Sequence, residues 1–392
     1  MFKTYKNVLK NNNILTISTT MLLTYGSFLS WFFLLPLYLR RMGATEDQIG
    51  TSYFAINFAL CVFQFPGGII ADKIGRKNII AYPTFLFPVL FLISAYTQNW
   101  VIVVVCITLA MLINGLQMPA IYSIIAESVK SEDRGLGFSI FEIAISASFA
   151  LGPGIGSLIA NSDMGIKKLI IASALINIPA AIARAVFMKE TKSHQEHKFN
   201  FGQLLKSFNT DLLLCLMAFV FFAFMLNTTL YGPFITIYAK DSIKLTDPGI
   251  QKMFMSGGLL AIVFNFLGGR LTQKFGARTV MILGGLGHTL LLLPWLGSDS
   301  FEIATFWYVL IYLFLQLVFI GHSTILADLT ETRTRSSIMG LFGLISSALG
   351  AFAPKLGTEL VKYFGQKAPF YLAIIFAMLM IIYLLPIKYE RN

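Results

Sequence analysis

Long apolar runs alternate along the chain with short charged segments. Each run is close to the roughly 20 residues that an α-helix needs to cross the hydrocarbon core of a bilayer. The charge clusters delimit twelve such runs, with predicted bounds of 14–39, 49–71, 78–96, 100–126, 135–160, 167–188, 211–239, 249–272, 279–297, 301–327, 336–360 and 367–387. The pattern predicts an all-α integral membrane protein with twelve transmembrane helices.

Composition supports this interpretation. Hydrophobic residues make up 56% of the 392 residues and charged residues only 12%, against about 25% charged in an average soluble domain. The formal net charge of +11 could indicate a nucleic-acid partner, but its Lys and Arg residues lie between apolar runs and not on a soluble basic module. We therefore expect membrane lipids around the chain and no nucleic acid.

The distribution of charge predicts the orientation. With the amino terminus, the segments after even-numbered spans and the carboxy terminus placed inside, most of the net positive charge is cytoplasmic, as the positive-inside rule requires. Asn11 to Leu39 carries no charge and is longer than a signal-peptide core. We expect a multi-pass protein of the cell membrane with both termini in the cytoplasm.

An internal repeat relates the two halves by a shift of 201 residues. Gly67 and Gly68 match Gly268 and Gly269, and the same shift matches further glycines, prolines and charges. These further pairs are Gly75 with Gly276, Lys77 with Arg278, Glu127 with Asp328, Arg134 with Arg335, Pro153 with Pro354, and Gly156 with Gly357. Repeats of this kind are typical of transporters whose substrate site lies between the halves.

A charged turn follows the second predicted span. It reads G-x-x-x-D-K-x-G-R-K from Gly68 to Lys77. Gly75 permits a tight bend, Asp72 can face a helix amino terminus, and Arg76 can pair with an acid or a lipid headgroup. The alternative interpretation is an ordinary cytoplasmic loop that follows the positive-inside rule, which would need only the basic residues.

This turn closely resembles the loop 2–3 signature of the major facilitator superfamily, and the resemblance extends over essentially the whole chain. It implies two pseudo-symmetric six-helix halves, 1–188 and 211–392, joined by a cytoplasmic loop at 189–210. It also implies that Asp72 faces Ser336 and Ser337 and that Arg76 pairs with Glu127, which locks the cytoplasmic side. Arg134 belongs to the same gating set. The second copy is degraded, with Gln273 and Ala277 at the positions of Asp72 and Arg76.

The fifth span carries a second signature. Gly152, Pro153 and Gly156 stand in the run A-L-G-P-G-I-G-S, where proline bends a helix and glycine allows close helix packing. The run resembles the superfamily's antiporter motif, with Ser157 replacing the last glycine, and so implies export in exchange for protons. Plain helix packing would account for the same residues.

One position departs from the family pattern. Many proton-coupled exporters have an arginine on the fourth helix, four residues before a glycine. Gly115 matches that glycine, but Met111 stands where the arginine would be. The departure favours a facilitator or importer of a polar metabolite as the alternative function.

Glu142 is the clearest ionisable residue within a span. A charge in mid-bilayer is costly and is a functional candidate by default. Ser146, Phe149, Pro153 and Gly156 follow Glu142 on one helix face. Glu142 is therefore our proton-coupling candidate, and a structural acid near the cytoplasmic third of the helix is the alternative.

We expect simpler roles for the other polar groups within or near the spans. Lys355 and Glu359 have the i, i+4 spacing of an ion pair, and Arg184 is expected to extend to the lipid headgroups. His288 and His322 are expected to be interior histidines. The pair His194 and His197 is weak evidence for a metal, so we expect no metal and no cofactor.

Polar and aromatic residues on the spans that line the cavity in this family are candidates for the substrate site. They are Tyr25, Trp31, Asn57, Asn114, Gln117, Tyr122, Asn227, Tyr231, Asn265 and Gln316.

The sequence predicts a secondary transporter, in the first instance a proton-coupled exporter of a small amphipathic or hydrophobic compound, working as a monomer by alternating access. A receptor or lipid-handling protein on the same fold is an alternative of another class. No span carries a nucleophile–base pair, a P-loop or a zinc pattern, so an enzyme is not expected.

Overall fold

The computed structural model describes residues 8, 10–130, 134–160, 163–191, 208–330 and 335–387, and within these ranges all regular secondary structure is α-helical. Each of the twelve predicted apolar ranges contains one helix or a pair of helices separated by a short break. The all-α prediction is confirmed.

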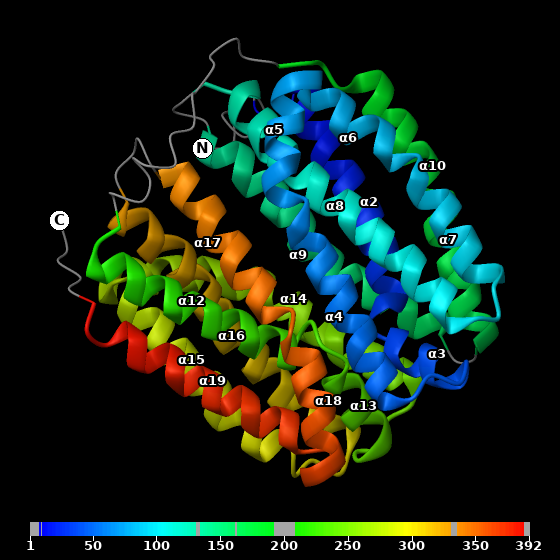
Figure 1. The fold of residues 1–392 in the computed structure, drawn as a ribbon, viewed down its shortest axis with the longest axis vertical. Coiled ribbons are helices and arrows are strands. Elements are labelled where there is room, and N and C mark those ends of the chain that lie inside the picture. Colours follow the sequence, from blue (N-terminus) through cyan, green and yellow to red (C-terminus); the bar gives the residue numbers. More distant parts are fainter. Residues whose placement is uncertain are drawn as a thin grey trace. The chain divides into compact units, whose positions relative to one another are not determined.

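The chain divides into two compact units (Figure 1). Unit 1 comprises residues 1–44 and 56–196, and unit 2 comprises residues 45–55 and 197–392. The helices of unit 1 are α2 (Asn12–Phe32), α3 (Leu35–Arg41), α5 (Gln64–Ile74), α6 (Arg76–Thr84), α7 (Leu86–Tyr96), α8 (Trp100–Ser128), α9 (Arg134–Ile159) and α10 (Asp163–Phe187). Helix α4 (Glu46–Val62) contributes its first turns to unit 2 and the remainder to unit 1.

Unit 2 repeats the helical pattern of unit 1. Its further helices are α12 (Thr210–Thr228), α13 (Phe234–Asp241), α14 (Asp247–Phe275), α15 (Ala277–Trp295), α16 (Phe301–Leu329), α17 (Arg335–Gly350), α18 (Ala353–Phe364) and α19 (Ala368–Leu384). The closest pairings are α2 with α9 in unit 1 and α15 with α16 in unit 2.

Eight helical spans in the described residues are long and apolar enough to cross a membrane, and α2 with α3, bent by 47°, makes a ninth. The other three predicted spans are less regular. One is divided between α4 and α5, one is α14, and one is α19, an apolar helix of 17 residues. The structure is therefore consistent with twelve spans.

Polar side chains fix where several helices begin. Asn11, Asn99, Asn209, Thr246 and Ser300 each stand before a helix and accept hydrogen bonds from its first backbone N–H groups. These N–H groups have no partner within the helix, so a side-chain cap satisfies them.

Prolines account for the helix breaks. The second helix of the broken pairs α2/α3, α12/α13 and α17/α18 begins beside Pro36, Pro233 and Pro354, respectively. Pro83 lies one residue before the end of α6. Proline lacks the N–H that would continue the helical ladder and clashes with the preceding turn.

The internal repeat is visible in two equivalent turns. Gly75 separates α5 from α6 with φ +102 and ψ 144, and Gly276 separates α14 from α15 with φ +83 and ψ 151. Both conformations lie in a region that side chains other than glycine rarely adopt. The shift of 201 residues therefore relates backbone conformations as well as residue types.

Candidate functional site

The turn between α5 and α6 holds an acidic side chain that comes from far along the sequence. Glu190, just beyond α10, accepts hydrogen bonds from the backbone N–H groups of Arg76 (3.0 Å) and Lys77 (3.1 Å). These are the first residues of α6. A carboxylate at a helix amino terminus satisfies free donors and interacts favourably with the helix dipole.

The side chain of Arg76 forms an ion pair in the same region. Its guanidinium contacts both carboxylate oxygens of Glu127 at the end of α8, at 2.8 to 3.0 Å. The hydroxyl of Thr191 also donates to Glu127, at 2.7 Å. Both partners of the ion pair are mostly buried, so the two parallel contacts are stronger than an exposed pair. The contact expected between Arg76 and Glu127 is present.

The segment after α10 is also tied to the start of α2. The amide of Asn13 accepts from the backbone N–H of Lys189 (2.7 Å) and donates to its carbonyl (3.1 Å) and to Ser128 (2.9 Å). Together with Glu190 and Thr191, these contacts join α2, α6, α8 and α10 at the end of unit 1 that carries the charged turn. The partners lie 64 positions apart for Thr191 and Glu127 and more than 100 apart in the other contacts, so the sequence pattern gave no local signal for them.

The structure does not describe the side chains of several residues predicted for the site. They are Asp72, Arg134, Asn265, Gln273, Ser336 and Ser337, and the central-loop histidines His194 and His197 lie outside the described residues altogether. The expected approach of Asp72 to Ser336 and Ser337 remains a prediction.

The glycines of the antiporter-like motif bring two helices into contact. A Cβ atom on Gly152 of α9 would lie 2.6 Å from the carbonyl oxygen of Gly26 on α2. Gly152, Pro153 and Gly156 are all buried. This motif therefore forms a tight crossing of α9 on α2 within unit 1.

Glu142 lies one third of the way along α9, inside the membrane-spanning stretch Leu136–Ile159. Its side chain is exposed on the helix surface. No Lys or Arg in the described part of unit 1 forms a salt bridge with it. A carboxyl group in this position is open to exchange of a proton or contact with a cation.

Tyr25 on α2 and Asn114 on α8 form a polar pair within unit 1. The Asn114 amide donates to the phenol oxygen of Tyr25 at 2.7 Å. Two of the residues predicted for the substrate site are thus in contact.

Arg184 of α10 lies in the interior of unit 1, and the expectation that it extends to the headgroups is wrong. Only 1% of the residue is exposed. Its guanidinium donates to Thr20 on α2 (2.9 Å), Thr84 on α6 (2.9 Å) and Gln117 on α8 (3.4 Å). Ala180, Ala181, Ala183 and Ala185 surround it in sequence, and such small residues let neighbouring helices approach closely.

The other predicted cavity residues differ in exposure. Trp31 is completely buried and donates to Ser173 at 3.0 Å, and Gln117 is 2% exposed. These two pack between helices of unit 1 and are not open to a cavity there. Tyr122 is 41% exposed, and Asn57 is partly exposed. In unit 2, Asn227 is buried, whereas Tyr231 and Gln316 are partly exposed.

An ion cluster lies in unit 2, where α18 meets the first turn of α4. Lys355 contacts Asp47 and Glu359, the latter at 3.3 Å. Lys362 contacts the same two acids at 3.4 and 3.1 Å. The predicted pair of Lys355 and Glu359 is confirmed, and the sequence did not indicate the participation of Asp47 from 308 residues away.

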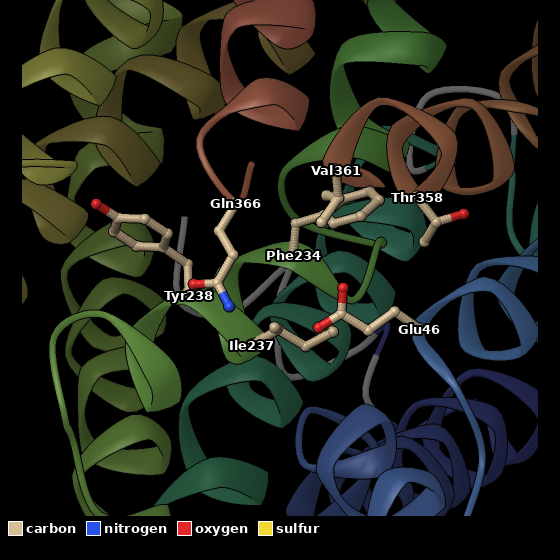
Figure 2. A pocket seen from close by; sticks show the side chains of 7 residues that line it. All are labelled: Glu46, Phe234, Ile237, Tyr238, Thr358, Val361 and Gln366. Atoms are coloured by element: carbon tan, nitrogen blue, oxygen red, sulfur yellow. The ribbon is translucent and has the colours of Figure 1, made fainter. Parts of the chain in front are cut away.

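Figure 2 shows a small pocket in unit 2. Its lining residues are Glu46, Phe234, Ile237, Tyr238, Thr358, Val361 and Gln366. The ring of Phe234 packs against Gly357 of α18 so closely that a Cβ atom on Gly357 would clash with it. None of the residues predicted for the substrate site lines this pocket.

The two histidines within the spans of unit 2 have different surroundings. His288 is completely buried in α15. His322 of α16 stacks on Phe219 of α12, with ring centroids 3.7 Å apart. Phe219 in turn contacts Phe342.

Comparison with known proteins decides the family. The family model described as Major Facilitator Superfamily matches residues 16–225 and again 217–392. The chain belongs to the major facilitator superfamily. It is therefore a multi-pass membrane protein of a transporter family, and the family assignment and the membrane class predicted from the sequence are confirmed.

Relatives with curated functions are named for drug resistance. The quinolone resistance protein NorA of Staphylococcus aureus (strain COL) is 24% identical over 355 residues, covering 87% of each chain. Multidrug resistance protein 2 of Bacillus subtilis (strain 168) is 22% identical over 257 residues, covering 64% of each.

Solved transporters share the superfamily fold. The bacterial homologue of the human lysosomal transporter Spinster has a TM-score of 0.75 at 12% identity, covering 95% of this chain and 94% of the other. The nucleoside transporter NupG has a TM-score of 0.72 at 16% identity, covering 97% and 100%. At these identities the likeness shows the fold alone.

Proposed function

We propose that this superfamily transporter exports a small amphipathic or hydrophobic compound from the cell in exchange for protons, by alternating access of two six-helix halves. It acts as a monomer in the cell membrane with both termini in the cytoplasm. Glu142 takes up and releases the coupled proton. The turn of Gly68, Asp72, Gly75, Arg76 and Lys77 is part of the gate, together with Glu127 and Arg134.

One observation carries the proposal. Glu142 is an exposed carboxyl inside a membrane-spanning helix, and no described basic side chain forms an ion pair with it. An ionised carboxylate facing lipid is costly, so this side chain suits a path that water and substrate reach. The drug-resistance names of the relatives favour export of drug-like molecules.

A second candidate rests on Met111. It stands on α8 where many proton-coupled members of the family have an arginine, which favours a facilitator or an importer of a polar metabolite.

Purified protein in liposomes with an imposed pH gradient tests the two candidates. Internal pH is followed while a lipophilic cation, a fluoroquinolone, a sugar and an organic acid are added in turn. We expect the cation or the fluoroquinolone to drive proton flux in the wild type. We also expect Glu142→Gln to abolish that flux while substrate still binds, since the amide cannot exchange a proton.

Glu302→Gln is the matched control, because Glu302 is an exposed acid in the first turn of α16. Proton flux equal to wild type in Glu142→Gln would reject Glu142 as the proton site. Substrate movement without proton flux in the wild type would favour the facilitator.

A further inference from the structure

Helix α4 contributes to both compact units. Residues 45–55 belong to unit 2, and the remainder of the helix, from Ile56 onward, belongs to unit 1. The helix runs without interruption from Glu46 to Val62, and residues 51–62 include neither glycine nor proline. Sharp bends in a helix almost always occur at such residues or at bulges in the helical ladder. Helix α4 is therefore one stiff segment that packs with two different sets of neighbours.

The second part of α4 is held on α8 by close backbone contact. A Cβ atom on Gly115 of α8 would clash with the carbonyl oxygen of Leu60. The contact continues into α5, where a Cβ atom on Gly67 would lie 2.6 Å from the carbonyl oxygen of Leu116. Both glycines are buried, and glycines that let two helix backbones touch make a tight interface. This end of the helix is fixed within unit 1.

The first part of α4 contacts α18 through one helical face. Asp47, Gly50 and Phe54 are spaced three and four residues apart, which places them on the same side of the helix. Asp47 joins the ion cluster with two lysines of α18. A Cβ atom on Gly50 would clash with the hydroxyl of Thr358, and the rings of Phe54 and Phe352 have centroids 4.7 Å apart. The three residues thus form a continuous contact with α18.

The contact with α18 is composed largely of exposed groups. The side chains of Asp47, Lys355 and Lys362 are 35 to 47% exposed, and about half of Phe352 is exposed. Exposed ion pairs add little stability, because water replaces each partner when the two separate. The hydroxyl of Thr358 donates to the carbonyl of Lys355 at 2.9 Å, independently of α4. Release of this contact would therefore leave none of these groups buried and unpaired.

The two contacts of α4 lie toward opposite ends of one span. Helices α4 and α5 together form the second predicted span, and α5 leads into the charged turn at Gly75. The start of α4, with Asp47, is therefore at the other membrane face, which the distribution of charge predicts to be extracellular. Alternating access moves one half of a transporter against the other. A stiff helix cannot follow two bodies that move apart, so one of its two contacts must release.

We propose that the first part of α4 and α18 form a releasable outer gate. Asp47, Gly50 and Phe54 rest on α18 when the outer face is closed, and they leave α18 with the remainder of α4 when that face opens. The inference rests on the proposed function, because it takes alternating access as the mode of transport. It does not depend on Glu142 as the proton site or on the gating role of Asp72.

Reversible cross-linking of the full-length protein in liposomes tests the gate. In the double variant Asp47→Cys with Lys355→Cys, a short bis-methanethiosulfonate reagent joins α4 to α18 through bonds that a reductant cleaves. The three native cysteines are buried and are not expected to react. We expect the link to lower proton-driven transport of ethidium, a lipophilic cation, at least tenfold, and the reductant to restore it.

The double variant Ser242→Cys with Gln366→Cys is the matched control. The two side chains form a hydrogen bond of 2.8 Å within unit 2, and neither lies on α4. The same link there should change transport less than twofold, because it joins two parts of one compact unit. Mass spectrometry measures the yield of each link. Fully linked Asp47→Cys with Lys355→Cys that transports as fast as its reduced form would overturn the inference.

A distance measurement separates failure of the gate from failure of the proposed function. Thr51 on α4 and Tyr363 on α18 are exposed, and spin labels on cysteines at these positions report their separation by double electron–electron resonance without any substrate. Asp47→Lys adds a third lysine to the contact and should increase the population at longer distance, because like charges repel. Glu302→Lys reverses an exposed acid in the first turn of α16 and should leave the distances unchanged.

The outcomes differ for the two proposals. Unchanged distances in Asp47→Lys would overturn the gate, and the cross-linking result decides in its place if that variant does not fold. Longer distances in Asp47→Lys, together with no substrate-driven proton flux in the wild type, would overturn the proposed export and retain the gate.

Discussion

The carboxylate of Glu190 occupies the space that a side chain on Gly75 would need. A Cβ atom on Gly75 would lie 2.5 Å from Oε2 of Glu190, which accepts from the N–H of Lys77, while Oε1 accepts from the N–H of Arg76. The glycine of the charged turn is thus required twice, by its positive φ and by the acid that caps the next helix.

Gly75→Ala should lower the melting temperature of the detergent-solubilised protein more than Gly43→Ala. Both positions have φ near +100°, a strain of roughly 1–2 kcal/mol for alanine. Only Gly75 has atoms within 4 Å of the new methyl group, so there Glu190 must also leave its donors. Equal decreases for the two variants would contradict the capping role of Glu190.

The ion pair of Arg76 and Glu127 should show strong energetic coupling. Unfolding of Arg76→Gln, Glu127→Gln and the double variant in mixed detergent micelles would give an interaction energy of about 1–3 kcal/mol. The pair is mostly buried and makes two parallel contacts. Additive effects, with no interaction energy, would show that the pair is as weak as an exposed surface pair.

A glycine pair tests the crossing of α2 and α9. In Gly152→Ala, the new methyl group would meet the backbone of Gly26, which cannot turn aside as a side chain can. We expect a clear loss of thermal stability. Gly26→Ala has open space around it and should be neutral or slightly stabilising, since alanine is the better helix former. The opposite order of melting temperatures would rule out the close approach.

Asp47 should stabilise unit 2 in a pH-dependent way. The hydrogen bond from Lys355 holds the pKa of Asp47 below its ordinary value of 3.8. A lowered pKa in the folded state means that the contribution is present at neutral pH. It begins to fall near the ordinary pKa and is lost as pH falls through the lowered one.

Melting temperatures of wild type and Asp47→Asn, compared across pH, measure this contribution. The wild type should melt higher at pH 7, and the difference should vanish in acid and shrink at high salt. Glu302→Gln is the control for loss of an exposed acid. A difference that persists in acid would assign the effect of Asp47→Asn to something other than charge.

The sequence predicted the membrane-spanning ranges and the two glycine turns. The length of an apolar run and the backbone freedom of a glycine are both local properties of the chain. The sequence did not predict the partners of Arg184, since these come from three helices and one of them lies 164 residues away. The charge alone suggested a headgroup contact, and only the alanines around it indicated burial. Glu190 and Thr191 fell in the predicted central loop for the same reason.

The division of helix α4 between the two units affects experiments that cleave the protein into two fragments. Its first turns, with Asp47, belong to the same compact unit as α18, although they precede most of unit 1 in the chain. A single cleavage in the central loop would therefore separate the carboxy-terminal fragment from residues 45–55, which pack within unit 2. It would also separate Lys355 from Asp47. Fragment complementation would succeed only if the amino-terminal fragment supplies residues 45–55.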